Sequence, residues 1–301
     1  MELVVILQES YTQLVSMFPF QVIPACTVEG STSQGSQSIP TQDTPSIMIK
    51  SITPRKLRTF NIVAGFLHLA QGIAVVLLSK SFTLPISGNY LHFNVATQGL
   101  EPASTVLFNL SLPLLIAVFF FLSAIAHFTI ATVYNKRYNE QLKKGINIAR
   151  WIEYSLSASI MIVAVALLVG IYDSMTLVAM FVLVGLMNLF GLVMEVHNQT
   201  TKKTNWLSFW LGCVAGIVPW IIIAFTLWLG AHNGSPAPTF VYWIFVSIFL
   251  FFNTFAVNMA LQYRKVGPWK NYFYGERTYI ILSLVAKSLL AWQVFAGTLR
   301  P

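Results

Sequence analysis

Seven long apolar segments follow one another along most of the chain. They cover roughly residues 58–79, 104–133, 147–172, 174–194, 206–230, 239–262 and 277–299. Each is close to the length of about 20 residues that an α-helix needs to cross a bilayer. The segments lack the strict alternation of barrel strands, and helices satisfy their own backbone groups in lipid. The pattern predicts an all-α membrane protein built as a seven-transmembrane-helix bundle.

Two stretches depart from this pattern. Residues 80–103, between the first two segments, alternate Phe, Leu, Tyr and Val around a Gly-Asn pair, which predicts a short β-hairpin in the first outer loop. Residues 1–47 begin with apolar patches broken by Glu, Gln and Pro, and continue into the polar string EGSTSQGSQSIPTQDTPS. We expect residues 1–47 to be a disordered or non-native extension, and residues 48–301 to form the seven-helix domain.

Basic residues fall almost entirely on one side of the predicted bundle. Of 18 Lys and Arg residues, 15 lie before the first segment, between segments two and three, four and five, or six and seven, or at the adjoining segment ends. Only Lys80 and Arg300 lie on the opposite side. The positive-inside rule therefore predicts a cytoplasmic N-terminus and an extracellular C-terminus.

Composition supports the membrane interpretation. Hydrophobic residues make up 56% of the chain and charged residues 9%, whereas soluble domains have about 25% charged residues. A net charge of +8 in a soluble protein would raise the question of nucleic-acid binding, but here the distribution of charge is explained by orientation. We expect a multi-pass protein of the cell (plasma) membrane, with the lipid bilayer and no nucleic acid as partner.

The remaining basic residue, Lys287, lies inside the seventh segment, in the string YIILSLVAKSLLAWQVFAG. Eleven residues at 1.5 Å each place it about 16 Å from the inner end of the helix. A charge at the bilayer centre costs about 2.5–3.5 kcal/mol or more, so such residues usually have a function. The alternative is a lysine that snorkels to the interface. The depth favours a desolvated amine that forms a Schiff base with an aldehyde cofactor.

A carboxylate at similar depth is expected to pair with this lysine. Glu153, in the third segment, is the candidate, because most other acids lie in the tail or in loops. The alternative is an interfacial Glu153 that pairs with Arg150 on the adjacent turn. An unpaired buried charge is costly, which favours the pair with Lys287. Asp173, in a tight outer turn, needs no special role.

Further polar residues lie within the apolar segments. His68 and Gln71 share one face of the first helix, and His127 follows Ser123 by four residues in the second. These groups are either satisfied core side chains or the walls of a small hydrated pocket. Glu195, at the inner end of the fourth segment, is either interfacial or functional.

Several strings resemble one family of retinal proteins. They are RWIEYSLSAS, LSLVAKSLLAWQVFAGTL, FLHLAQ, FWLGCVAGIVPW, LFFN and GERTYI, and the likeness covers about residues 56–300. In sequence and in their order along the chain they resemble the heliorhodopsins, which are similar to microbial rhodopsins but have an inverted topology.

The resemblance implies covalently bound all-trans retinal on Lys287, with Glu153 as its counterion. It implies further roles around the cofactor for Ser283, Ser157, His68, Gln71, His127, Asn147, Arg150, Glu195 and Trp292. The two serines would tune the Schiff-base environment, and the two histidines with Gln71 would form a water-containing cavity on the inner side. Asn147 and Arg150 would organise the inner helix ends. The resemblance also implies a homodimer.

The function implied is a light-sensing photoreceptor with a slow photocycle, no efficient ion pumping and an unknown cytoplasmic signalling partner. The alternative is a light-gated proton or ion pathway, or a weak light-driven transporter. Eleven residues on either side of Glu153 stand Leu142 and Ala164, which cannot relay protons and therefore count against pumping. The chain also has no nucleophile-and-base pattern and no H-E-x-x-H string, so we expect no enzymatic activity.

Overall fold

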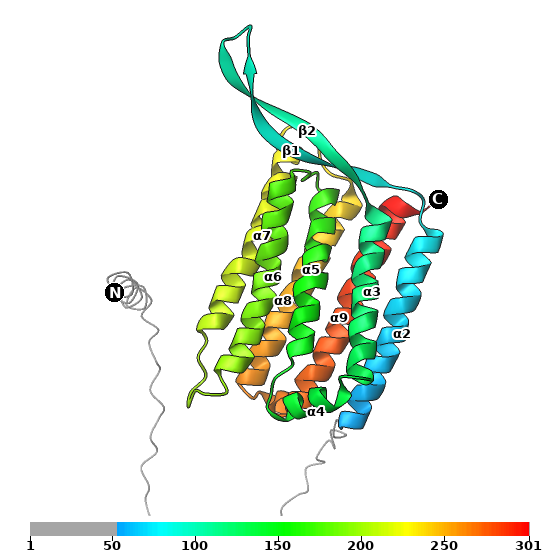
Figure 1. The fold of residues 1–301 in the computed structure, drawn as a ribbon, viewed down its shortest axis with the longest axis vertical. Coiled ribbons are helices and arrows are strands. Elements are labelled where there is room, and N and C mark those ends of the chain that lie inside the picture. Colours follow the sequence, from blue (N-terminus) through cyan, green and yellow to red (C-terminus); the bar gives the residue numbers. More distant parts are fainter. Residues whose placement is uncertain (1–52, 301) are drawn as a thin grey trace, which may run out of the picture. The chain divides into compact units, whose positions relative to one another are not determined.

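The computed structural model describes residues 53–300. Seven helices in this range are long and apolar enough to cross a membrane, and they stand side by side as one bundle (Figure 1). They are α2 (Pro54–Leu78), α3 (Leu112–Ala131), α5 (Ile148–Leu168), α6 (Ser174–His197), α7 (Leu207–His232), α8 (Thr239–Tyr263) and α9 (Tyr272–Val294). A π-helical turn, η2 (Phe295–Leu299), continues α9. The predicted extension, residues 1–47, lies outside the described residues.

Polar side chains define where several helices begin. The Thr53 hydroxyl, the Asn147 amide, the Asp173 carboxylate and the Asn271 amide each accept a hydrogen bond from a backbone N–H in the first turn of the helix that follows. These caps satisfy donors that have no partner inside the helix. Pro54 also occupies the first position of α2, where its missing N–H costs nothing.

The first connection is a long β-hairpin, which confirms the predicted element but corrects its extent. Strand β1 (Thr83–Asn94) pairs antiparallel with β2 (Gly99–Ser111). The segment from 104 to 111 is therefore a strand, and the predicted second helix begins only at Leu112, with Pro113 in its first turn. The two-residue alternation in STVLFNLS is the signal of a strand that the apolar composition concealed.

The turn of the hairpin lies at residues 95–98, whereas the Gly-Asn pair was predicted to form it. Gly88 and Asn89 lie inside β1, next to an irregularity of the register between Ile86 and Ser87. At the turn, the Asn94 side chain accepts a hydrogen bond from the backbone N–H of Ala96, at 2.9 Å. This local hydrogen bond stabilises a turn whose four residues include no glycine.

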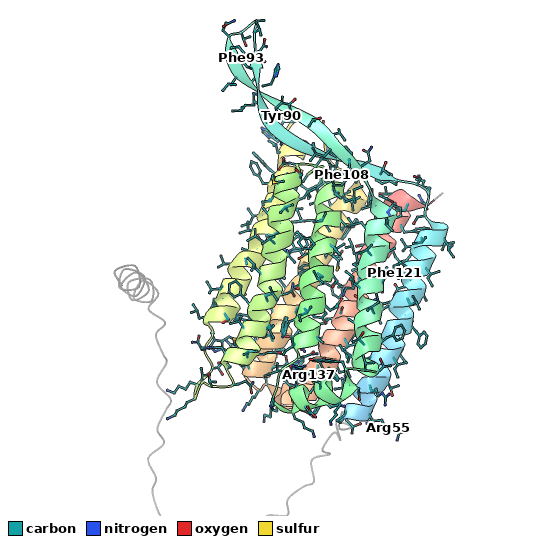
Figure 2. All side chains as sticks on the ribbon, viewed as in Figure 1. Arg55, Tyr90, Phe93, Phe108, Phe121 and Arg137 are labelled. Carbon is teal, nitrogen blue, oxygen red and sulfur yellow. The ribbon has the colours of Figure 1, made fainter. Side chains whose placement is uncertain are left out.

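The hairpin crosses the end of the bundle opposite α4 and reaches beyond the helices, with Phe108, Tyr90 and Phe93 along it (Figures 1 and 2). Asp173 attaches it to α6, because its carboxylate accepts a hydrogen bond from the Asn89 amide at 2.9 Å while capping α6. Hydrogen bonds from the Thr176 hydroxyl and amide lower the pKa of Asp173. Asp173 thus has a structural role that sequence analysis did not assign.

At the opposite end of the bundle a short helix, α4 (Asn135–Lys143), joins α3 to α5 (Figure 1). Sequence analysis treated this basic stretch as a loop. The helix buries Tyr138 and Leu142 against a small apolar cluster that includes Leu57 and Ile280. Its formation depends on these contacts with α2 and α9, since a helix of this length is marginal alone.

The interior differs between the two ends of the bundle. The half nearer the hairpin is filled by buried apolar side chains, such as Ile116, Ile162, Val165, Leu290 and Val294. Residues 158–168 of α5 and 288–297 of α9 contain no carboxylate or histidine. The half nearer α4 holds the buried charged residues. The buried charged side chains therefore lie between the middle of the bundle and the end formed by α4.

Candidate functional site

Lys287 of α9 and Glu153 of α5 form an ion pair in the middle of the bundle. The Lys287 Nζ lies 2.9 Å from Glu153 Oε1, and both side chains are almost fully buried. Lys287 also donates to the Ser283 hydroxyl at 2.8 Å, from one turn earlier in the same helix. Ser123 of α3 donates to the same Glu153 oxygen at 2.6 Å. The ion pair and its hydrogen bond to Ser123 therefore connect α3, α5 and α9, and Glu153 neutralises the charge of Lys287.

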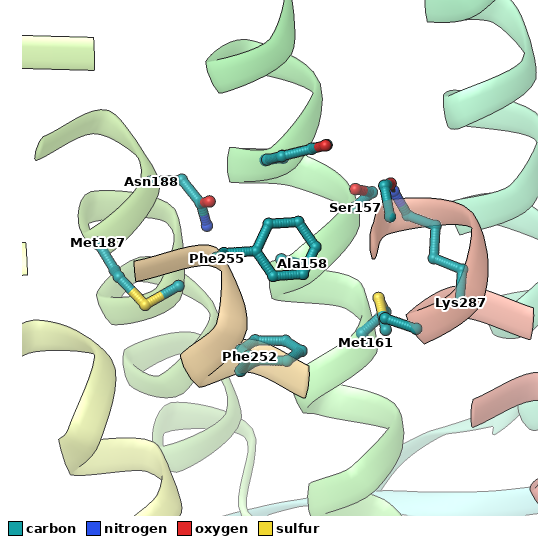
Figure 3. Close-up of a pocket in the computed structure, with 11 residues that line it drawn as sticks. Ser157, Ala158, Met161, Met187, Asn188, Phe252, Phe255 and Lys287 are labelled. Carbon is teal, nitrogen blue, oxygen red and sulfur yellow. Dashed lines mark hydrogen bonds between the residues drawn. The ribbon is translucent and has the colours of Figure 1, made fainter. Parts of the chain in front are cut away.

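An apolar cavity extends from the Lys287 side chain toward α6 and α8. It lies between α5, α6, α8 and α9. Figure 3 shows Lys287 beside Ser157 at one end, Phe252 and Phe255 of α8 along it, and Met187 and Asn188 of α6 beyond them.

The cavity suits an apolar cofactor attached to the lysine. Its walls are mostly apolar and aromatic, and Lys287 is its one charged lining residue. Among residues 53–300, the buried Ser157 hydroxyl has no hydrogen-bond partner, although buried polar groups normally have one. Ser157 lines the cavity next to Lys287, so this donor is available to a group bound there. The residues present therefore fit retinal on Lys287.

The structure brings together two of the three residues predicted to form an inner cavity. The rings of His68 and His127 stack with their centroids 5.4 Å apart, and His127 Nδ1 lies 2.8 Å from the Asn61 side-chain oxygen. Within the described part of the chain, neither ring nitrogen of His68 has a hydrogen-bond partner. Gln71 lies elsewhere, accepting a hydrogen bond from the Trp292 indole at 3.0 Å.

A second buried cluster surrounds Arg150, one turn before Glu153. The Arg150 guanidinium forms ion pairs with Glu195 of α6 and Glu276 of α9. The alternative pair between Arg150 and Glu153 is therefore not formed. Arg150 also lies 4.0 Å from the centre of the Tyr279 ring, a cation–π contact.

Further hydrogen bonds hold the two carboxylates of this cluster. Asn147 donates to both, through its backbone N–H to Glu195 at 2.9 Å and through its amide to Glu276 at 2.7 Å. The other donors are the Trp151 indole and the Tyr272 hydroxyl to Glu195, and the Tyr138 hydroxyl to Glu276. Burial and the neighbouring Glu276 raise the pKa of Tyr138 well above its usual value, so it stays a neutral donor.

Glu276 is the site residue that sequence analysis missed. It follows the basic string RKVGPWKNYFYG and precedes Arg277, so it was taken for part of a loop. The structure begins α9 at Tyr272, which places Glu276 on the first helical turns. A signal was present, because residues 276, 280, 283 and 287 are spaced by four, three and four, as on one helix face.

Comparison with solved structures identifies the class of fold. The chain is similar to the crystal structure of a light-driven proton pump, LR (Mac), from Leptosphaeria maculans, with a TM-score of 0.54 and 15% identity over 80% of this chain and 93% of that one. This likeness shows that the protein has the seven-helix fold of the microbial rhodopsins. None of the curated proteins matches the chain.

The heliorhodopsin family model matches residues 57–299, and the chain therefore belongs to the heliorhodopsin family. Membership confirms the resemblance read from the sequence motifs. It implies an integral membrane protein and a photoreceptor that binds retinal.

The geometry of the Arg150 cluster leads to a stability prediction. Replacing Arg150 by Gln leaves two carboxylates buried without their cation, so we expect a loss of about 3–5 kcal/mol in unfolding free energy. Glu276→Gln should cost less, because Glu195 still neutralises Arg150. Denaturant unfolding of the purified protein measures both, with the exposed Arg137→Gln as control. Equal stability of Arg150→Gln and Arg137→Gln would contradict the assignment.

Proposed function

We propose that this heliorhodopsin is a light sensor that binds all-trans retinal covalently through Lys287 and responds with a slow cycle rather than efficient pumping. The observation that supports this most directly is the buried pair of Lys287 and Glu153 at the end of an apolar cavity. When bound, retinal supplies the absorption of light and an isomerisation that displaces the nitrogen carried by Lys287.

Glu153 acts in this proposal as the counterion of that nitrogen. Its carboxylate is fixed by the Ser123 hydroxyl, so the negative charge stays close to the position of the Lys287 nitrogen. Ser283 accepts a hydrogen bond on one side, and Ser157 offers a free hydroxyl on the other. In a site of low dielectric, such fixed partners stabilise a charge more strongly than water-exposed ones.

The buried histidines near the pair lie toward the α4 end, whereas residues 158–168 and 288–297 hold no carboxylate or histidine. Ser123 lies one turn from His127, which contacts Asn61 and stacks on His68. Buried polar groups of this kind are commonly joined by ordered water. A proton that leaves the nitrogen therefore finds acceptors on the α4 side and returns by the same route. That cycle moves no net charge across the membrane, as suits a sensor.

We further propose that the α4 end faces the cytoplasm of a cell whose plasma membrane holds the protein. The support is the split of basic residues between the two sides of the predicted bundle, 15 against two. After Cys26 and Cys213 are replaced by Ser, a thiol reagent confined to the outside of intact cells should label Ser235→Cys and spare Lys202→Cys. The reverse labelling would overturn this orientation.

Two partners belong to the proposal. The family resemblance implies a homodimer, and the hairpin exposes apolar side chains such as Leu91, Val106 and Phe108, as interaction surfaces often do. A signalling partner would contact the cytoplasmic end, next to the Arg150 cluster. The mass of the detergent-solubilised protein by light scattering tests the dimer, and a monomer at all concentrations would exclude it.

Removal of the lysine tests the cofactor assignment. Lys287→Ala should abolish visible absorbance after reconstitution with retinal, because the other lysine in the seven spanning helices, Lys56, lies exposed in the first turn of α2 and away from the cavity. Absorption spectroscopy measures this, and circular dichroism shows whether the helices remain. The control is Lys144→Ala, at the basic end. A visible pigment formed by Lys287→Ala at ordinary retinal concentrations would show that the attachment site is elsewhere.

The counterion role predicts a spectral change. In Glu153→Gln the positive charge on the nitrogen loses its carboxylate, so the absorption maximum should shift to longer wavelength, or the nitrogen should lose its proton and absorb in the near ultraviolet. Spectra recorded across a pH series measure the change, with the exposed Glu140→Gln as a charge-matched control. If spectrum and titration match the unmodified protein, another group is the counterion.

Electrical recording separates sensing from transport. We expect no steady photocurrent in illuminated, voltage-clamped cells at zero potential and symmetric pH, because 158–168 and 288–297 hold no carboxylate or histidine for a second relay. A steady current in either direction would refute the sensor proposal. Current seen only under an applied gradient would favour the alternative of a light-gated pathway, with Glu195 and His127 as the first residues to neutralise.

A further inference from the structure

The α4 end of the bundle holds another cavity, separate from the one at Lys287. It is open to solvent, with a volume of about 380 Å³. Its walls come from three connections: the turn between α4 and α5, the loop between α6 and α7, and the segment from the end of α8 through η1 (Gly267–Lys270) to the start of α9. Three connections that are distant in sequence thus enclose one pocket.

Four lysines line this cavity and give it a strongly positive character. They are Lys144, Lys202, Lys265 and Lys270, and the lining includes no Asp or Glu. The ion pairs found among residues 53–300 involve none of the four. Cationic groups gathered around a concave surface focus their field and raise the local concentration of anions. The four lysines therefore favour a ligand with several negative charges.

The other walls are rigid and polar. Tyr263 donates its hydroxyl to the Met194 carbonyl at 3.1 Å, and Trp269 donates its indole N–H to the Asn258 side chain at 2.7 Å. Amide and hydroxyl groups complete the lining, from Asn198, Gln199, Thr201, Thr204 and Gln262. The volume is that of a small-molecule site, which favours a compact anion over a folded protein surface.

We propose that this cavity binds a small anion of the phosphate class, either a soluble phosphate ester or pyrophosphate, or the phosphate headgroup of a lipid. Lysine binds phosphate as a compact point charge with three donors, and four lysines match more than one negative charge. The cavity also contacts the Arg150 cluster, because Tyr272 lines it and donates its hydroxyl to Glu195 at 2.9 Å. The assignment does not depend on the proposed photochemistry.

Calorimetry with pyrophosphate tests the soluble source. The full chain with retinal is placed in nanodiscs of phosphatidylcholine, and we expect saturable binding at one site. The double variant Lys202→Gln, Lys265→Gln should weaken this binding roughly tenfold, since two exposed charge contacts are worth about 1.4 kcal/mol together. The control is Lys136→Gln, Lys203→Gln, which removes the same charge at the same end outside the cavity. It should retain nearly full affinity.

Nanodiscs that contain phosphatidic acid test the lipid source. If pyrophosphate does not bind but native mass spectrometry shows phosphatidic acid retained by the protein and by the control double variant, and lost from Lys202→Gln, Lys265→Gln, the phosphate site is lipid-bound. Absence of binding in both arms overturns the proposal, as does equal weakening in the two double variants. Circular dichroism, which does not require a bound pigment, shows whether each variant is folded.

Discussion

A charged lysine in the middle of a membrane protein must be neutralised, and much of the bundle is arranged around that requirement. Moving an ion into a medium of low dielectric costs several kcal/mol even after relaxation. Glu153 offsets this cost for Lys287, and Ser123 and Ser283 satisfy the remaining hydrogen-bonding capacity. These contacts join α3, α5 and α9 at one depth. Loss of either charge would leave the other buried and unpaired.

The second charged cluster shares two helices, α5 and α9, with the first. Arg150 precedes Glu153 by one turn in α5, and Glu276 precedes Lys287 by three turns in α9. Since helices transmit small displacements as rigid elements, a change in the charge pair of Lys287 would act on the contacts of Arg150. The proposed sensor thus has a physical connection from its cofactor site toward the basic end of the bundle.

The features that sequence predicted are those set by composition over long windows. Seven apolar runs, one intramembrane lysine and one nearby carboxylate could be read directly, because each departs strongly from its surroundings. The missed features depend on contacts between distant segments. Helix α4 depends on the burial of Tyr138 against α2 and α9. The turn of the hairpin depends on a hydrogen bond to the side chain of Asn94, the last residue of β1. Glu276 was missed because basic residues continue from the loop after α8 into the first turns of α9, so the sequence shows no boundary between loop and helix.

Similarity of fold to a proton pump does not make this protein a pump, since one fold hosts many functions. Transport depends on where proton acceptors stand along the helices. Ala164 and its buried neighbours in α5 are apolar, and Leu142, on the other side of Glu153 in sequence, belongs to α4 rather than to α5. The buried histidines and carboxylates around the Lys287 pair therefore lie toward the α4 end. In the proposed sensor, a light-driven change in charge would therefore act on the α4 end, where Arg150, Glu195 and Glu276 meet the loops.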